Sequence, residues 1–121
     1  MTEIQNPKKY DLEERTLKFS KQTREFVAKL SKTIALVEDS KQLVRSSGSV
    51  GANYIEANES LSKRDFVVRI KICRKEAKEN RYWLHLINTD NNLELNKERE
   101  ILIKESTELM NIFGAIIRKS V

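Results

Sequence analysis

Basic residues gather on one flank of the segment between residues 62 and 87, which has a clear helical period. From Lys63 to Arg81 this segment holds eight basic and three acidic residues, a net +5 that equals the net charge of the whole chain. At about 100° per residue, seven of the cations fall within one arc beside the apolar stripe: Lys63, Arg64, Lys71, Arg74, Lys75, Lys78 and Arg81. Such a row suits phosphate binding, because each neutralised phosphate releases condensed counterions.

The acidic residues of the same segment lie on its other flank. They are Asp65, Glu76 and Glu79, whereas Tyr82 and His85 extend the basic flank. This sorting of charge favours a surface that follows a phosphate backbone. The alternative is a solvated helix face whose lysines provide solubility and pair with acids on the first helix.

Three apolar residues, Val68, Ile72 and Trp83, also fall on the acidic flank, outside the predicted core stripe. Apolar side chains outside a core stripe indicate a second buried surface. We therefore expect a homo-oligomer in which these three residues form the subunit interface. Arg69 lies on this flank as well, one helical turn after Asp65.

The sequence offers no workable set of catalytic or metal-binding residues. A di-metal carboxylate site in a helix bundle needs Glu-x-x-His pairs on two helices, but the one histidine, His85, follows Tyr82 at that spacing. Cys73 lies in the core stripe, where a small buried residue is a simpler interpretation than a nucleophile. The segment "GSVG" (48–51) lacks the Gly-Lys-Ser/Thr ending of a P-loop. We therefore expect no enzymatic activity, no cofactor and no bound metal.

The composition favours an all-α protein. The 121 residues are 39% hydrophobic and 34% charged, a balance typical of elongated helices with narrow apolar stripes. One proline and three glycines leave little turn chemistry for a β fold. One cysteine, no N-terminal leader and no apolar run of about 20 residues predict a soluble cytoplasmic protein without membrane contact. The pI of about 9.4 is compatible with a polyanionic partner.

Apolar spacings of three and four residues predict four helices joined by short connections. Asp11 is the predicted N-cap of the first helix, Asp39 or Ser40 of the second, and Ser62 of the third. The turn before the fourth helix is "NTDNN". The expected ranges of the helices are 11–32, about 40–58, 62–87 and 94–118.

Helices with such short connections predict an antiparallel up-down-up-down four-helix bundle. We expect a flexible arm over 1–10 and a single domain over 11–121. The residues that repeat at helical spacing form the predicted core. In chain order they are Leu12, Thr16, Phe19, Thr23, Phe26, Leu30, Leu43, Ser47, Val50, Tyr54, Ala57, Leu61, Phe66, Ile70, Cys73, Ala77, Asn80, Leu84, Ile87, Leu102, Leu109, Ile112, Phe113 and Ile116.

The segment "SSGSVGANYIEANES" (46–60) has the composition of a loop, but the apolar stripe passes through it in phase. We therefore predict that it is helical up to about Asn58. A glycine inside a helix costs about 1 kcal/mol relative to alanine, so its presence indicates that another helix packs closely. The small residues that would permit this approach are Ser47, Gly48, Gly51 and Ala52.

Asn53 and Glu56 are polar residues three positions apart in the same segment, so they share a helix face. They form either an exposed pair or a partly buried pair. A partly buried pair would fix the helix register or a subunit contact, because buried polar groups need partners.

Three segments together carry a resemblance to a known family: "QLVRSSGSVGANYIEA" (42–57), "SKRDFVVRIKICRKEAKENRYWLHLI" (62–87) and "IKESTELMNIFGAII" (103–117). They resemble the four-helix-bundle proteins encoded in intervening sequences of bacterial 23S rRNA genes, also called the S23 ribosomal protein family. The resemblance covers nearly the whole chain from about residue 12. The positions that match its polar and aromatic signature are Arg45, Ser49, Asn53, Glu56, Glu79, Tyr82 and Trp83.

The resemblance implies a left-turning antiparallel four-helix bundle that assembles into a homopentameric barrel. In a related branch, which serves diversity-generating retroelements, a basic pentamer associates with reverse transcriptase and nucleic acid. The family label refers to gene location and implies no ribosomal role.

These observations lead to one leading expectation and two alternatives. The leading expectation is a non-enzymatic homo-oligomer that binds nucleic acid, RNA first, along the phosphate backbone through the basic flank of the third helix. The first alternative is a scaffold or accessory protein whose basic flank meets an acidic or nucleoprotein partner. The second, an enzyme or metal protein, lacks the necessary motifs.

Overall fold

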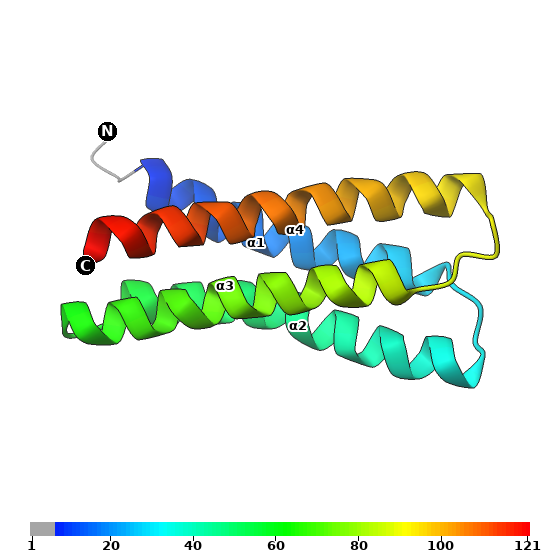
Figure 1. Cartoon of the computed structure of the whole chain (residues 1–121), viewed down its shortest axis with the longest axis horizontal. Helices are drawn as coiled ribbons and strands as arrows, with labels where there is room; N and C mark the ends of the chain where they lie inside the picture. The colour runs from blue at the N-terminus through cyan, green and yellow to red at the C-terminus, as the bar shows by residue number, and fades with distance from the viewer. Residues whose placement is uncertain (1–6) are drawn as a thin grey trace.

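Four long helices run antiparallel in an elongated bundle (Figure 1). The computed structural model describes the backbone of residues 7–121 and the side chains of residues 12–121. No β-strand occurs in this part of the chain, and each helix packs on the next, which confirms the predicted four-helix bundle. The helices are α1 (Pro7–Ala28), α2 (Ile34–Asn58), α3 (Lys63–Leu86) and α4 (Leu93–Ser120).

The connections alternate between the two ends of the bundle (Figure 1). The α1–α2 and α3–α4 connections lie at one end, and the α2–α3 turn lies at the other end beside the C-terminus of α4. Helix α3 contacts both α2 and α4 extensively, whereas the contact between α1 and α4 is the smallest of the four. One side of α3 therefore remains outside the bundle.

Side-chain caps fix the starts of α3 and α4. The Ser62 hydroxyl accepts a hydrogen bond from the Asp65 backbone N–H at 3.0 Å, so the predicted cap of the third helix is confirmed. Asn92 caps α4 in the same way through the Leu95 N–H at 3.0 Å. The predicted turn at 88–92 ends at this cap residue.

The start of α2 differs from the prediction. Its N-cap is Thr33, whose hydroxyl accepts the Leu36 N–H at 3.2 Å. The expected start at Asp39 or Ser40 is therefore wrong, because an earlier threonine already provides the acceptor that the first turn needs. Both of those residues lie inside the helix.

The first helix is also shifted towards the N-terminus. It begins at Pro7 rather than at Asp11 and ends at Ala28 rather than at residue 32. Proline suits a first helical position, because the N–H that it lacks would have no partner there. Four residues of the expected arm are therefore helical, and its remaining positions, 1–6, lie outside the described residues.

The core follows the predicted apolar stripe closely. Phe19, Phe26, Leu43, Ile70 and Leu109 are among its fully buried side chains, and most of the other predicted positions are buried as well. Phe66, Ile112 and Ile116 are partly buried and pack against this core. Leu61 contradicts the prediction, because it lies beyond the end of α2, where the helical period no longer applies, and it is 99% exposed.

The glycine-rich segment is helical through Asn58, as predicted, and α1 packs against part of it. At Gly51, a Cβ would lie only 2.9 Å from Thr16 Oγ1 of α1, so the close approach is confirmed there. Gly48 has more room, with no such neighbour nearer than 3.8 Å. Ala52 is exposed, so the explanation by close packing is wrong for this residue.

Candidate nucleic-acid interface

The seven cations of the predicted phosphate-binding flank lie on the outer surface of α3. We call them the basic face: Lys63, Arg64, Lys71, Arg74, Lys75, Lys78 and Arg81. Six are exposed, and Arg81 is half-buried. Within the described part of the chain, none of the seven forms an ion pair. Their charges therefore remain available to a bound anion.

Two members of the basic face lean toward α4. An Arg81 guanidinium nitrogen lies 3.4 Å from the Thr107 hydroxyl. Arg74 Nε lies 3.5 Å from the position that a Cβ on Gly114 would occupy. The positive surface therefore extends from the outer side of α3 to its junction with α4.

The acidic flank of α3 is engaged with α2. Arg45 of α2 makes ion pairs with Glu79 and, at 3.3 Å, with the largely buried Glu76. The Glu76 contact has the distance of an ion pair but does not form a hydrogen bond. Because these carboxylates form ion pairs with Arg45, they do not neutralise the basic face.

The alternative pairing of the basic face with acids of the first helix is not found among the described residues. The ion pairs made by α1, and by Lys29 directly after its end, run to α4 instead. Arg15 contacts Glu105 and Glu108, both at 2.7 Å, and Lys29 contacts Glu98 at 3.0 Å.

The signature residues of α2 serve the contact with α3. Asn53 donates to the Ser49 carbonyl at 2.9 Å and to its hydroxyl at 3.0 Å, and it accepts from Arg69 of α3 at 2.9 Å. Asn53 is half-buried, but Glu56 is exposed. The two residues therefore do not act as one buried pair: Asn53 contacts α3 through Arg69, whereas Glu56 is exposed.

The predicted interface residues differ in exposure. Val68 is 50% exposed, and Ile72 is partly exposed. Together with the exposed Leu61 they line a groove of about 500 Å³ beside the α2–α3 turn. Trp83 instead packs partly against the core of its own chain, and its Nε1 lies 3.4 Å from a Glu79 carboxylate oxygen.

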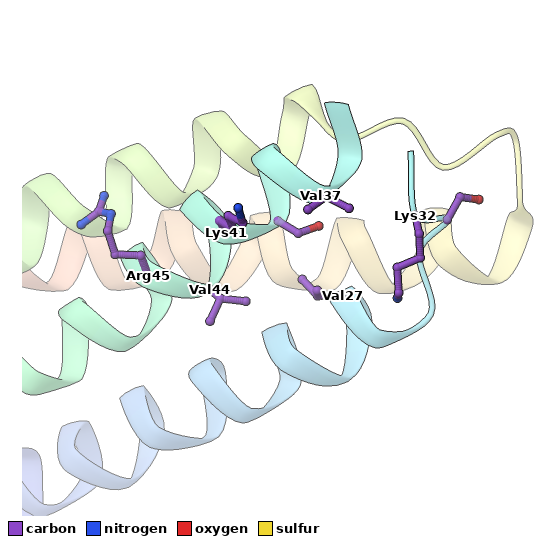
Figure 2. A pocket seen from close by; sticks show the side chains of 8 residues that line it. Val27, Lys32, Val37, Lys41, Val44 and Arg45 are labelled. Carbon is purple, nitrogen blue, oxygen red and sulfur yellow. The ribbon is translucent and has the colours of Figure 1, made fainter. Parts of the chain in front are cut away.

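A second groove, of about 490 Å³, lies between the end of α1 and the start of α2 (Figure 2). Val27 of α1 and Val44 of α2 point into the space between the two helices. Three cations, Lys32, Lys41 and Arg45, also line it. Lys41 pairs with Glu38 and Arg45 with α3, so these two charges are partly compensated.

Cys73 occupies the core position that its spacing predicts. It is fully buried, and its thiol lies 3.4 Å from the Val50 carbonyl of α2, to which it can donate. Burial raises the pKa of the Cys73 thiol to about 12. The thiol is therefore protonated near neutral pH, which removes the thiolate that a nucleophile requires.

Two broader site classes find no support within the described residues. No group of three or more His, Cys, Asp or Glu side chains is placed to hold a metal ion. None of the four helices combines the length and the apolar character that a membrane crossing requires.

Two features of the surface were missed by sequence reasoning. One is the pairing of Arg45 with both acids of α3, which depends on how two helices face each other. The other is the groove between α1 and α2. The sequence does contain a pattern that could have predicted this groove, because Val27, Val37 and Val44 lie outside the predicted core stripe. The same kind of pattern led to the prediction of an interface at Val68.

Comparisons with known proteins agree with this architecture. A solved structure of a protein with unknown function, from the S23 ribosomal protein family of Bacteroides thetaiotaomicron, is 29% identical and superposes with a TM-score of 0.77. The match covers 92% of this chain and 98% of that one. No curated protein matches the chain significantly. The model of the 23S rRNA-intervening sequence protein family matches residues 8–115, and the chain therefore belongs to this family.

Proposed function

We propose that this protein binds nucleic acid through the basic face of α3 and has no catalytic activity. The observation that carries the proposal is the contrast between the two flanks of α3. The acids Glu76 and Glu79 are held by Arg45, whereas the cations of the basic face have no acidic partner among the described residues. A surface with this unbalanced positive charge attracts a polyanion.

The binding that such a face supports is directed at the phosphate backbone. Lysine and arginine side chains neutralise phosphates without reading the base sequence. From Lys63 to Arg81 the face extends over roughly 27 Å, at 1.5 Å per helical residue, which is long enough to contact several phosphates. RNA is the leading ligand of this proposal, as in the expectation from the sequence, and the test below includes DNA as well.

The test is the affinity for fluorescently labelled RNA and DNA at several salt concentrations. The variant carries Lys71→Glu, Lys75→Glu and Lys78→Glu, and a matched control carries Lys18→Glu and Lys21→Glu on α1 and Lys97→Glu on α4, all at exposed positions.

We expect the basic-face variant to bind at least about tenfold more weakly. We also expect the slope of log affinity against log salt to fall by about 2 to 3, because three phosphate contacts are lost. The control should retain most of the affinity and slope of the wild type. Unchanged binding by the basic-face variant, or an equal loss in the control, would contradict the proposal.

We also propose that the protein is a homo-oligomer. The expected form is the homopentamer that the family resemblance implies. The exposed apolar residues Leu61 and Val68 support self-association, because a subunit contact would remove them from water. Repeated copies of the basic face would then bind one nucleic acid with avidity, so that a weak single site suffices.

A second candidate function is that of a scaffold for an acidic or nucleoprotein partner. The groove between α1 and α2 favours this function, because both valines and cations line it (Figure 2). An acidic partner could contact the two kinds of side chain together. The distinguishing measurement is co-purification after nuclease treatment. A partner retained in constant stoichiometry by the wild type, and lost on Val44→Glu, would favour the scaffold; a partner lost with the nuclease would favour nucleic-acid binding.

A further inference from the structure

Tyr82 is an exposed aromatic residue at the end of the basic face. We propose that its ring is a stacking platform that makes this surface a site for single-stranded nucleic acid. The proposal rests on the nucleic-acid binding proposed above and names its substrate class.

The spacing of Tyr82 places it in line with three of the cations. Lys71, Lys75, Lys78 and Tyr82 follow one another at intervals of four, three and four residues, so they form one row along α3. The row is roughly 16 Å long at 1.5 Å per residue. A strand whose phosphates contact the lysines would therefore bring a base to the aromatic ring.

The structure leaves the Tyr82 ring accessible and holds it in place. The residue is 60% exposed. Its ring centroid lies 5.2 Å from that of Trp83, with 76° between the ring planes, which is an edge-to-face contact. Whichever ring supplies the edge, at least one face of Tyr82 is free of this contact. Trp83 itself packs against the core, so the platform has a firm support.

An exposed ring beside lysines selects for unpaired bases. Every base presents a flat π face, and stacking on an aromatic side chain is tolerant of sequence. In a duplex the base faces are already covered by their neighbours, so only the phosphates remain for the lysines. We therefore expect Tyr82 to contribute to the binding of single strands and not of duplexes.

The experiment compares the affinities of wild type, Tyr82→Ala and Tyr82→Phe for two probes at one salt concentration. The probes are a labelled 12-nucleotide oligouridylate and a 12-base-pair RNA duplex. Tyr82→Phe is the matched control, because it keeps the ring and loses only the hydroxyl. Circular dichroism melting and light scattering verify that each variant folds and assembles as the wild type does.

We expect Tyr82→Ala to weaken single-strand binding by about fivefold to a hundredfold, which is the range of one stacked base. Duplex binding should stay within about twofold, and Tyr82→Phe should match the wild type on both probes. Equal losses on both probes, an unchanged affinity for the single strand, or an altered oligomer size in Tyr82→Ala would overturn the platform.

The failure of this inference can be distinguished from the failure of the proposed function. If Lys71→Glu/Lys75→Glu/Lys78→Glu abolishes binding while Tyr82→Ala binds like the wild type, the basic face stands and the platform is wrong. If the wild type binds neither probe, the proposed function is wrong, and the inference about Tyr82 is wrong as well.

Discussion

Two glycines three positions apart in α2 occupy different surroundings. A Cβ on Gly51 would lie 2.9 Å from Thr16 Oγ1 and 3.2 Å from Thr16 Cβ. The Thr16 hydroxyl cannot move freely, because it donates to carbonyl oxygens of its own helix, that of Leu12 at 2.8 Å among them. A Cβ on Gly48 would meet only the ends of Ser20 and Arg24, at 3.8 Å. Gly51 is therefore required by packing, and Gly48 is not.

Alanine substitutions at these two positions should have opposite effects on stability. Gly48→Ala should raise the free energy of unfolding by up to about 1 kcal/mol, because alanine is the better helix former. Gly51→Ala should lower it by about 1–2 kcal/mol, because overpacking against Thr16 outweighs the same gain. Gly51→Leu should lower it further or disrupt assembly. Urea unfolding followed by circular dichroism measures all three, and a stabilised Gly51→Ala would refute the packing argument.

At the scale of elements, α1 and α4 depend on charge more than the other helix pairs do. Their contact is the smallest in the bundle. Across it, Arg15 holds Glu105 through two hydrogen bonds, at 2.7 and 2.8 Å, and Glu108 through a third at 2.7 Å. These carboxylates raise the pKa of Arg15 above its usual value, with Glu105 as the larger cause. A bidentate, partly buried pair stabilises more than an exposed one.

Removing this charge should loosen α1 from α4. Arg15→Met replaces the charged side chain with an unbranched apolar one of similar length to the arginine stem, and we expect it to lower the free energy of unfolding by about 1 kcal/mol. Lys41→Met is the control, because among the described side chains Lys41 pairs only with Glu38 of the same helix, and both are exposed. Its effect should stay below about 0.5 kcal/mol. Equal effects of the two substitutions in urea unfolding would show that the α1–α4 ion pairs have no special role.

At the scale of the whole molecule, the charges and the exposed apolar residues occupy different surfaces. The basic face lies on one flank of α3 and at its junction with α4, whereas Leu61, Val68 and Ile72 line the groove at the α2–α3 turn. Glu56 and Asp65 line the same groove. This separation allows subunits to associate at the groove while the basic face stays open.

Self-association can therefore be tested without altering the basic face. Light scattering of the wild type should show a mass several times 14.1 kDa, and five times that mass for a pentamer. Val68→Glu should lower the mass, because it adds a charge to the apolar part of the groove. Ile101→Glu is the control, since Ile101 is 60% exposed on α4, away from this groove. A wild-type protein that is monomeric at micromolar concentration would contradict the proposed homo-oligomer.

Much of the fold could be predicted from the sequence, because helical periodicity is a local property. The positions of Phe19, Leu43 and Ile70 at spacings of three and four were enough to place them in the core. Helix ends were predicted less well, because a cap depends on which of several suitable residues is used. The N-cap of α2 is Thr33 and not Asp39, and the apolar pattern does not show which of these two residues caps the helix.

The sequence by itself determined the four helices, their buried stripes and the gathering of cations on one flank of α3. Only the tertiary structure decided which charges have partners. Arg45 of α2 forms ion pairs with Glu76 and Glu79, whereas Lys71 and Lys75 are exposed to solvent. It also decided that Gly51, and not Gly48, faces another helix closely. The physical reason is the same in both cases. Periodicity fixes the direction of a side chain on its own helix, but its neighbour depends on how two helices are rotated and staggered against each other.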